Sequence, residues 1–239
     1  MRFLSATILA FGILAISACS VQQIQKTVDG YLKDAKPTTE EVVSGLKEAL
    51  EKGITNGAKK ASAVDGYYKN PQIKIPFPPD VQKVETKLRQ LGMDKQVDQF
   101  IETLNRGAEE AAKEAVPIFV SAIKQMTIND AWNILKGDKD AATQYLQKTT
   151  TSQLEDKFKP VIQKALDKVN ATKYYGDLVN TYNKIPFVDK VNPDLNDYAT
   201  TLAIDGLFKL VAQEEANIRS NPGARTTELL KKVFKEQDN

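Results

Sequence analysis

Apolar residues recur every three or four positions along almost the whole chain from residue 38 onward, and this spacing constrains the fold more than any other feature. The first run carries one apolar stripe: Val42, Leu46, Leu50, Ile54, Ala58 and Ala61. Residues at this spacing share one face of an α-helix. Outside two short proline-rich stretches, no segment shows the alternation of a strand. The pattern predicts an all-α fold, a single multi-helix domain of about eight to ten helices with two proline-rich extended straps.

Local signals predict where several helices begin, bend or pack closely. Thr38 and Glu41 have the spacing of a capping box, which predicts a helix start. Pro117 lies inside an apolar helical run, and we expect a kink or a break there. Pro160 lies inside another such run and is a second candidate for a kink. Three glycines in the first run weaken it by up to about 1 kcal/mol each relative to alanine, so we expect a close backbone approach there. They are Gly45, Gly53 and Gly57.

The two straps cover residues 70–80 and 184–193, and each contains the tetrapeptide Lys-Ile-Pro-Phe. In the 70–80 strap, apolar residues alternate with polar residues or proline, so we expect one face to be buried. The flanking residues differ, which favours two similar connectors over an ancient duplication, although a duplication stays open. Because the straps order backbone without a helix, we expect a partner or ligand to bind there. The residues expected to meet a partner are Ile75, Pro76, Phe77, Pro78 and Pro79.

The N-terminus is typical of a bacterial lipoprotein signal. Arg2 is followed by an apolar run from Phe3 to Ile16, which ends in Ser-Ala-Cys at positions 17–19. That run is shorter than the ~20 residues of a membrane span but suits a signal peptide. We therefore predict a signal peptide at 1–18, a lipid on Cys19, a tether at 19–37 and an all-helical domain at 38–239. A short helix within the tether is the alternative to a flexible linker.

These features predict a location in the bacterial cell envelope, with the protein lipid-anchored and facing the periplasm. Ser20, rather than aspartate, follows the predicted lipidated cysteine. Under the common proteobacterial sorting rule, this residue predicts the outer membrane. The membrane is thus an expected partner through the lipid on Cys19.

Missing residue types restrict the chemistry. The chain has no histidine, and Cys19 is its one cysteine. Serine–histidine triads, cysteine–histidine dyads, histidine-ligated zinc and internal disulfides are therefore excluded. The 33 Lys and Arg residues nearly balance 31 Asp and Glu residues, so we expect no nucleic-acid partner. We also expect no cofactor and no metal, because the Asp138–Asp140 segment lacks the further ligands of a calcium loop.

Four blocks of sequence resemble a known family: residues 70–80, 117–127, 140–145 and 221–234. Their order and spacing are similar to domain-of-unknown-function family 4197, over roughly residues 41–236. The family consists of exported bacterial proteins, often with a lipoprotein signal, and has no assigned activity. The resemblance therefore implies export and an all-helical fold, and it implies no particular chemistry.

Asp205 is the most unusual charged residue, because it interrupts the apolar stretch 202–208. A carboxylate buried alone is costly, so we expect a pair with Arg106 or Arg225. A polar cluster facing a ligand cleft is one alternative, and simple exposure is another. The cluster would contain Asn105, Arg106, Asp205 and Arg225.

Other charged and aromatic pairs have simpler interpretations. Adjacent glutamates at 40–41, 109–110 and 214–215 lie beside lysines, and we expect them on solvated helix faces. For the tyrosine pairs at 67–68 and 174–175 we expect core packing with hydroxyl groups at the surface. Stacking on a sugar or a partner is the alternative for those tyrosines.

The leading hypothesis for function is a non-catalytic binding or interaction module that meets an unknown envelope protein or small ligand. The rival is a histidine-free, carboxylate-dependent enzyme acting on envelope glycans, with Asp205 beside a basic residue. A third hypothesis is a structural spacer without a cleft. An open cleft with two converging carboxylates would favour the enzyme.

Overall fold

The computed structural model describes residues 36–184, 186–187 and 190–235. Cys19, the predicted signal peptide and nearly all of the predicted tether lie outside the described residues. The chain divides into two compact units, Met1–Pro37 and Thr38–Asn239, and the fold below is that of the second unit.

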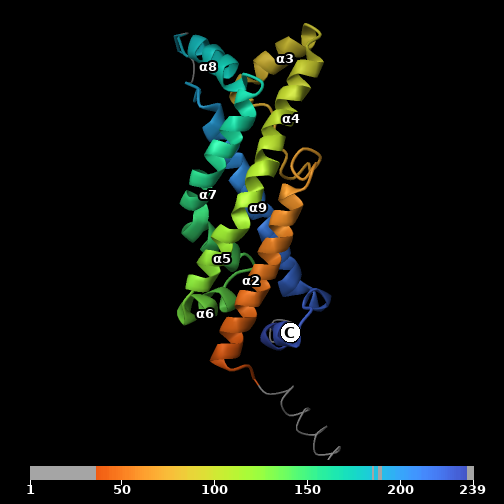
Figure 1. Ribbon diagram of the computed structural model, residues 1–239, viewed down its shortest axis with the longest axis vertical. Coiled ribbons are helices and arrows are strands. Elements are labelled where there is room, and N and C mark those ends of the chain that lie inside the picture. Colours follow the sequence, from red (N-terminus) through yellow and green to blue (C-terminus); the bar gives the residue numbers. More distant parts are fainter. Residues whose placement is uncertain (1–35, 185, 188–189, 236–239) are drawn as a thin grey trace, which may run out of the picture. The chain divides into compact units, whose positions relative to one another are not determined.

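Helices account for all regular secondary structure in the described part of the chain, which confirms the all-α prediction (Figure 1). The α-helices are α2 (Thr39–Ser62), α3 (Gln82–Gln90), α4 (Asp94–Ala111), α5 (Ala115–Gln125), α6 (Ile128–Lys136), α7 (Ala141–Asp167), α8 (Ala171–Tyr182), α9 (Leu195–Ser220) and α10 (Glu228–Phe234). Three short 3-10 helices join them: η1 (Pro79–Val81), η2 (Ala112–Glu114) and η3 (Pro222–Ala224). No helix among the described residues combines the length and apolar character needed to cross a membrane.

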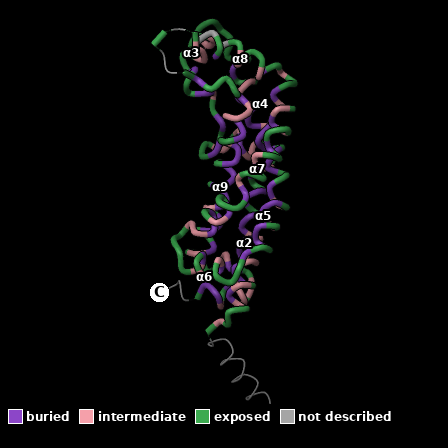
Figure 2. Tube along the Cα trace, turned by 90° about the vertical axis from the view of Figure 1, so that its left-hand side faces the viewer, coloured by how far each residue is buried: buried purple, intermediate pink, exposed green. Residues whose placement is uncertain are grey.

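Long helices packed side by side form the centre of the unit. α9 packs against α2 and α7, and α4 packs against α7, while α5 lies against α2 and α7. Their buried residues line the interior of this bundle, shown in purple in Figure 2. Phe119 of α5 meets Phe208 of α9 edge to face, with ring centroids 5.6 Å apart. The unit Thr38–Asn239 thus has its own hydrophobic core.

The glycines of α2 lie where other helices approach it closely, as expected. A Cβ at Gly57 would lie 3.4 Å from backbone atoms of Leu210 and Val211 in α9. A Cβ at Gly45 would lie 2.7 Å from a methyl group of Val233 in α10. The absence of side chains at these positions allows α9 and α10 to pack onto α2. At Gly53 the nearest atom is 3.5 Å away, which is ordinary van der Waals contact.

Proline has different effects at the two predicted kinks. The helical run breaks at η2, and Pro117 is the third residue of α5. The first N–H groups of a helix have no acceptor within it, so a proline there removes no helix hydrogen bond and is tolerated. At Pro160, in contrast, α7 continues without a break. Both Pro160 and Asp156, whose carbonyl would have accepted the missing bond, are exposed, so water can satisfy that carbonyl.

The 70–80 strap follows α2 and packs along the bundle. It starts as a turn at 71–73, runs without regular structure to Pro78, and ends in η1. Ile73 and Ile75 are buried and Phe77 is half-buried, which confirms that one face of the strap is covered. In the second strap, residues 185, 188 and 189 lie outside the described residues. Phe187 there is fully exposed, whereas Phe77 packs 5.0 Å from the ring of Phe100, so the two tetrapeptides differ in structural role.

Candidate functional site

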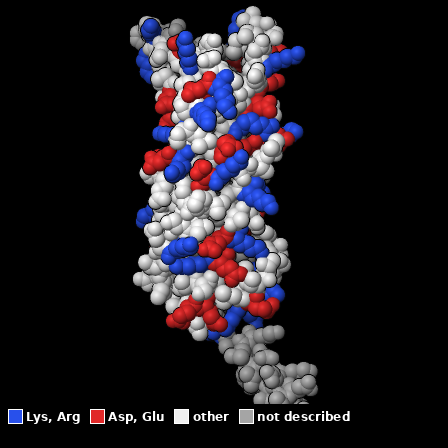
Figure 3. All heavy atoms as spheres, in the orientation of Figure 1, with Lys and Arg blue, Asp and Glu red and all other residues white. Residues whose placement is uncertain are grey.

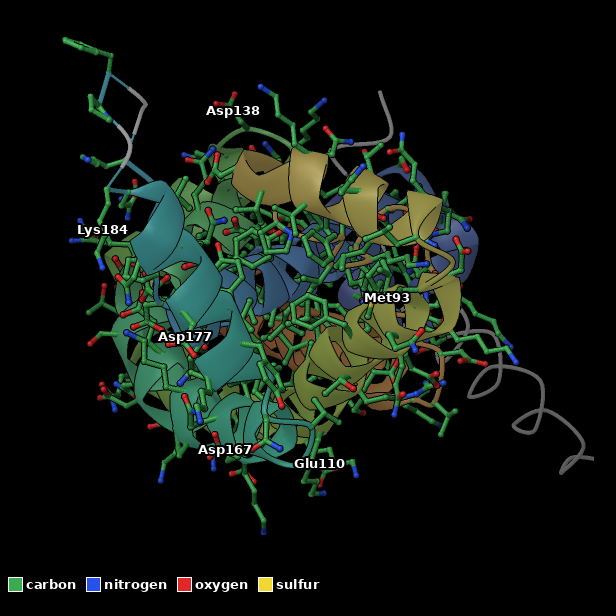
Figure 4. The ribbon with its side chains drawn as sticks, turned by 90° about the horizontal axis from the view of Figure 1, so that it is seen from above. Met93, Glu110, Asp138, Asp167, Asp177 and Lys184 are labelled. Atoms are coloured by element: carbon green, nitrogen blue, oxygen red, sulfur yellow. The ribbon has the colours of Figure 1, made fainter. Side chains whose placement is uncertain are left out.

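An apolar groove of about 720 Å³ opens at one end of the bundle. It lies between the 70–80 strap, α3, α4, the end of α7 and the start of α8. The molecule is hollowed at this end in Figure 3, and Figure 4 looks onto it with α8 on one side and α3 and α4 on the other. The lining residues are Phe77, Val84, Leu88, Met93, Gln96, Val97, Gln99, Phe100, Lys168, Val169, Ala171, Tyr174 and Tyr175.

The turn between α3 and α4 builds one wall of the groove. Gly92 has a φ of +76°, which only glycine adopts without strain. The Met93 N–H donates to the Leu88 carbonyl at 3.0 Å, and the Gly92 N–H donates to the Arg89 carbonyl at 2.9 Å. This Schellman pattern satisfies the end of α3 and folds it back on α4. Leu88 and Met93 consequently line the same cavity.

Arg89 ties the two helices of this wall together. Its guanidinium forms ion pairs with Glu85 at 3.0 Å, Asp98 at 2.9 Å and Asp94 at 3.4 Å. Glu85 lies on α3 and the two aspartates lie on α4. The hydrogen bonds to Asp98 and Glu85 raise the pKa of Arg89 above its ordinary value, so its charge is fixed. The ion pairs of Arg89 therefore hold this wall together, and none of the residues in them lines the groove.

A second turn, between α7 and α8, builds the opposite wall. Asn170 has a φ of +52° and reverses the chain. Gln163 of α7 donates to the Thr172 hydroxyl of α8 at 3.1 Å, which links the two helices. Tyr175 is buried and its hydroxyl donates to the Asn192 carbonyl at 3.5 Å. Burial raises the pKa of the Tyr175 hydroxyl, with a smaller contribution from Asp80, so this group stays protonated.

Asn105 holds the floor of the groove in place. Its side chain is fully buried, accepts the Ile75 N–H at 2.8 Å and donates to the Ile75 carbonyl at 2.8 Å. It also donates to the Ile101 carbonyl at 2.7 Å within α4. These bonds pair the strap backbone as a neighbouring strand would. The strap residue Phe77, packed on Phe100, then forms the floor.

Of the other residues expected on the strap, Pro78 is buried, whereas Pro76 and Pro79 are exposed. The Pro76 carbonyl accepts the Tyr198 hydroxyl at 3.3 Å. Only Phe77 of the five expected strap residues lines the groove.

Arg106 lies next to Asn105 but belongs to a separate polar cluster. Its guanidinium pairs with Glu109 at 2.7 Å, Asp65 at 2.8 Å and Glu102 at 3.1 Å. Glu109 is buried and also accepts the backbone N–H groups of Tyr67 and Tyr68, both at 3.1 Å. This cluster therefore fixes the chain as it leaves α2. The expectation that Glu109 lies on a solvated face is wrong.

The predicted pairing of Asp205 with an arginine is wrong as well. Asp205 is exposed on α9, and Arg106 has the partners given above. Arg225 is buried far along the chain, where it donates to the carbonyls of Ile218 at 3.0 Å and Arg219 at 2.8 Å at the end of α9. Asn105 and Arg106 are neighbours in α4 with different partners, whereas Asp205 and Arg225 lie elsewhere, so the structure does not bring the four candidate residues into one cluster.

Glu215 is a buried carboxylate that sequence reasoning placed on a solvated face. It accepts the N–H groups of Ala142 at 3.0 Å and Thr143 at 2.9 Å, at the start of α7. It also pairs with Arg219 at 2.9 Å, and Arg219 donates to the Ile134 carbonyl at 2.8 Å near the end of α6. A carboxylate is favourable at a helix N-terminus and a cation at a C-terminus. This ion pair therefore joins α6 and α7 to α9.

Two further sequence interpretations are corrected. Glu214 is buried and pairs with Lys60. Tyr67 is fully buried and its hydroxyl donates to the Ala203 carbonyl at 2.6 Å, so that hydroxyl does not reach the surface. Tyr174, in contrast, is largely exposed at the groove.

The groove has a chiefly apolar lining. Its described lining is apolar and aromatic except for Gln96, Gln99 and Lys168, and it includes no aspartate or glutamate. Within the described ranges, no three Cys, Asp or Glu side chains are grouped to hold a metal ion. On the face drawn in Figure 3, basic and acidic side chains are interspersed.

Comparison with known proteins identifies the family. The model of the family described as "Protein of unknown function (DUF4197)" matches residues 36–235. The chain belongs to the DUF4197 family. The match spans all the helices described above, so this DUF4197 protein presents the family domain as one helical bundle with an apolar end groove. No curated protein and no solved structure matches the chain.

Proposed function

We propose that the protein is a lipid-anchored binding module of the bacterial cell envelope, facing the periplasm, and that its end groove holds an apolar ligand. The observation that carries this proposal is the groove itself. Its volume of about 720 Å³ lies within the range of about 300–1,000 Å³ that is usual for small-molecule sites. A mostly apolar lining with a few polar groups is also usual for such sites.

The exposed apolar residues of this end support the same function. Leu91, Met93 and Tyr174 are large hydrophobic side chains that are exposed in the described part of the chain, and all three lie at the turns or helices that form the groove walls. Exposed apolar side chains gathered around one groove favour a site of interaction. The N-terminal end of α2 lies at the other end of the bundle (Figure 1). The unit Thr38–Asn239 therefore starts at the end opposite the groove.

The rival enzyme hypothesis finds no support in the groove. General acid–base chemistry on a glycan needs two carboxyl groups about 5–9 Å apart across a cleft. The described lining residues include none. Asp205, the carboxylate on which the hypothesis depended, is exposed on α9 and does not line the groove.

Binding of a neutral apolar dye tests the groove. The segment Thr38–Asn239 has its own core, and a cooperative thermal transition would establish that it folds alone. We expect N-phenyl-1-naphthylamine, excited beyond tryptophan absorption, to bind it saturably. Gln99 is exposed and lines the groove, so Gln99→Trp should fill the space and weaken binding ~10-fold, equivalent to about 1.4 kcal/mol.

The matched control is Gln153→Trp, at an exposed position of α7 that does not line the groove. It should bind the dye as the parent does. Dye binding that is not saturable, or that is equal in all three proteins, would contradict the proposal.

The anchor needs its own experiment because Cys19 lies outside the described residues. Cys19→Ser in the full chain should release the protein from membranes and abolish labelling by a fatty-acid analogue. Retention of the substituted chain in membranes would show that the lipoprotein assignment is wrong.

A further inference from the structure

We propose that the groove holds a single-chain amphiphile with one negative charge, of the class of a free long-chain fatty acid, and that Lys168 provides its counter-charge. The inference rests on the proposed function and specifies the ligand class for the same site.

The charge of the groove lining carries the proposal. Lys168 is the one charged residue among the described lining residues. Lys168 is exposed, and its ammonium group forms no hydrogen bond or ion pair with any residue that the structure describes. The neighbouring Asp167 accepts a hydrogen bond from Gln163 at 2.7 Å, so its carboxylate is engaged by an amide. An ammonium group without a partner beside an apolar cavity complements an anionic head group attached to an apolar chain.

The acidic residues of the opposite wall do not offset this charge. Glu85, Asp94 and Asp98 all pair with Arg89, and none of the three lines the groove. Asp80 is exposed and lies near the hydroxyl of Tyr175, but it does not line the groove. A cationic ligand would therefore meet Lys168 with no carboxylate among the described lining residues to hold it.

The remaining lining fits the rest of such a ligand. Each methylene group of a chain buried against this apolar lining stabilises the complex further. The side-chain amides of Gln96 and Gln99 are exposed and supply neutral donors on the wall formed by α4. A carboxylate accepts hydrogen bonds from both amides and ammonium groups. One unpaired cation and two amides match one small anionic head group.

Three probes with the same twelve-carbon chain isolate the head group. Dodecanoate, dodecan-1-ol and dodecyltrimethylammonium, each below its micelle concentration, would displace the dye from the segment Thr38–Asn239 at neutral pH. We expect dodecanoate to bind ~3- to 10-fold more tightly than the alcohol, because a charge-assisted contact at an exposed site adds a modest amount. The ammonium compound should bind least tightly.

The variant Lys168→Met keeps the apolar stem and removes the charge. It should reduce the affinity for dodecanoate to that for the alcohol and leave the alcohol unchanged. The control is Lys173→Met, in α8, which is exposed and does not line the groove. It should leave the affinities for all three probes unchanged.

The outcomes separate this inference from the proposed function. Equal binding of the three probes, unaffected by Lys168→Met, overturns the anionic ligand and leaves an apolar groove. An equal loss in the Lys173→Met protein overturns it too, because net charge would then explain the effect. Retention on phosphatidylglycerol vesicles without binding of dodecanoate shows a membrane surface in place of a free ligand. Failure of every probe and of the dye contradicts the proposed function itself.

Discussion

Asn105 is the residue whose loss should most affect the groove floor. It is fully buried and makes two hydrogen bonds to the backbone of Ile75, itself fully buried. Asn105→Ala leaves the N–H and the carbonyl of Ile75 without partners. A buried backbone group left unpaired costs about 1–3 kcal/mol, so two predict a loss of about 2–6 kcal/mol in the free energy of unfolding. Since domains of this size are stable by about 5–15 kcal/mol, the protein should stay folded.

Urea denaturation, followed by circular dichroism, measures this loss. Hydrogen exchange at the Ile75 amide measures it locally, because that N–H should lose protection while amides in the middle of α9 keep most of theirs. Asn133→Ala, at an exposed position of α6, is the control and should change stability by less than about 0.5 kcal/mol. A loss below about 0.5 kcal/mol for Asn105→Ala, or an Ile75 amide that stays protected, would refute the reasoning.

Asn105→Asp should make the stability of the protein depend on pH. The introduced carboxyl faces two carbonyl oxygens, Ile75 at 2.8 Å and Ile101 at 2.7 Å from the present amide nitrogen. Only its protonated form can donate to them, so its pKa in the folded state should lie above its value of about 3.9 in the unfolded chain. The folded state then binds more protons, and stability is highest at low pH and falls as the pH rises through the folded pKa. A variant whose stability did not fall over that interval relative to the parent would contradict this geometry.

Four further predictions concern the bundle. Glu215→Ala should lower the free energy of unfolding by about 3–5 kcal/mol in urea denaturation, because it leaves Arg219 and the start of α7 without their buried partner. Gly53→Ala should raise the melting temperature, because the nearest atom would lie 3.5 Å from the new Cβ and alanine favours a helix by about 1 kcal/mol relative to glycine. Gly206→Ala should lower it, because its Cβ would lie 2.8 Å from the ring of Tyr67. Hydrogen bonds from Lys69 and Arg106 hold the pKa of Asp65 below its ordinary value, so its contribution is present above the unfolded pKa and is lost as the pH falls through the folded one. Stability measured between neutral and acid pH should therefore fall less steeply in Asp65→Asn, and an unchanged slope would exclude this role.

Signals that act within one turn of helix could be predicted from the sequence. Thr38 accepts the Glu41 N–H at 3.2 Å, so the predicted helix start is confirmed. Thr127 accepts the Asp130 N–H at 3.1 Å in the same way, and Gly92 ends α3 with a positive φ. Each of these features depends on residues at most five positions apart, and so the sequence contains the whole interaction.

Burial of charged residues could not be predicted in the same way. Glu109 and Glu215 accept backbone N–H groups of residues 67–68 and 142–143, which carry no sequence signature as donors. Asp205 is the opposite case, since its apolar neighbours suggested burial. Thr201, Asp205 and Lys209 are all exposed at a spacing of four, so one narrow polar face of α9 was readable in the sequence. The apolar residues around Asp205 cover the other sides of that helix.

The groove was not predicted because its residues look like ordinary helix faces. Val84, Leu88, Val97 and Phe100 have the spacing of core residues, and sequence alone does not show which apolar face lacks a covering helix. In the structure, α3 packs chiefly on α4, and α8 packs on α7 and α9. The two walls are thus fixed by different neighbours.

The polar contacts that hold the two walls help to explain why the groove is open. Arg89 and the turn at Gly92 hold one wall, whereas the Tyr175 and Gln163 contacts hold the other, so the polar contacts that we describe for each wall do not involve the other wall. Leaving apolar surface in water costs about 25 cal/mol for each Å². Part of the lining already packs on the bundle core, since Ala171 and Tyr175 belong to that core and Phe77 and Val84 pack against it. Folds leave apolar surface exposed to water chiefly where function requires it. An open apolar groove therefore favours a binding role over a purely structural spacer. A ligand that fills the groove should then raise the melting temperature, and a spacer would show no such effect with any of the three probes.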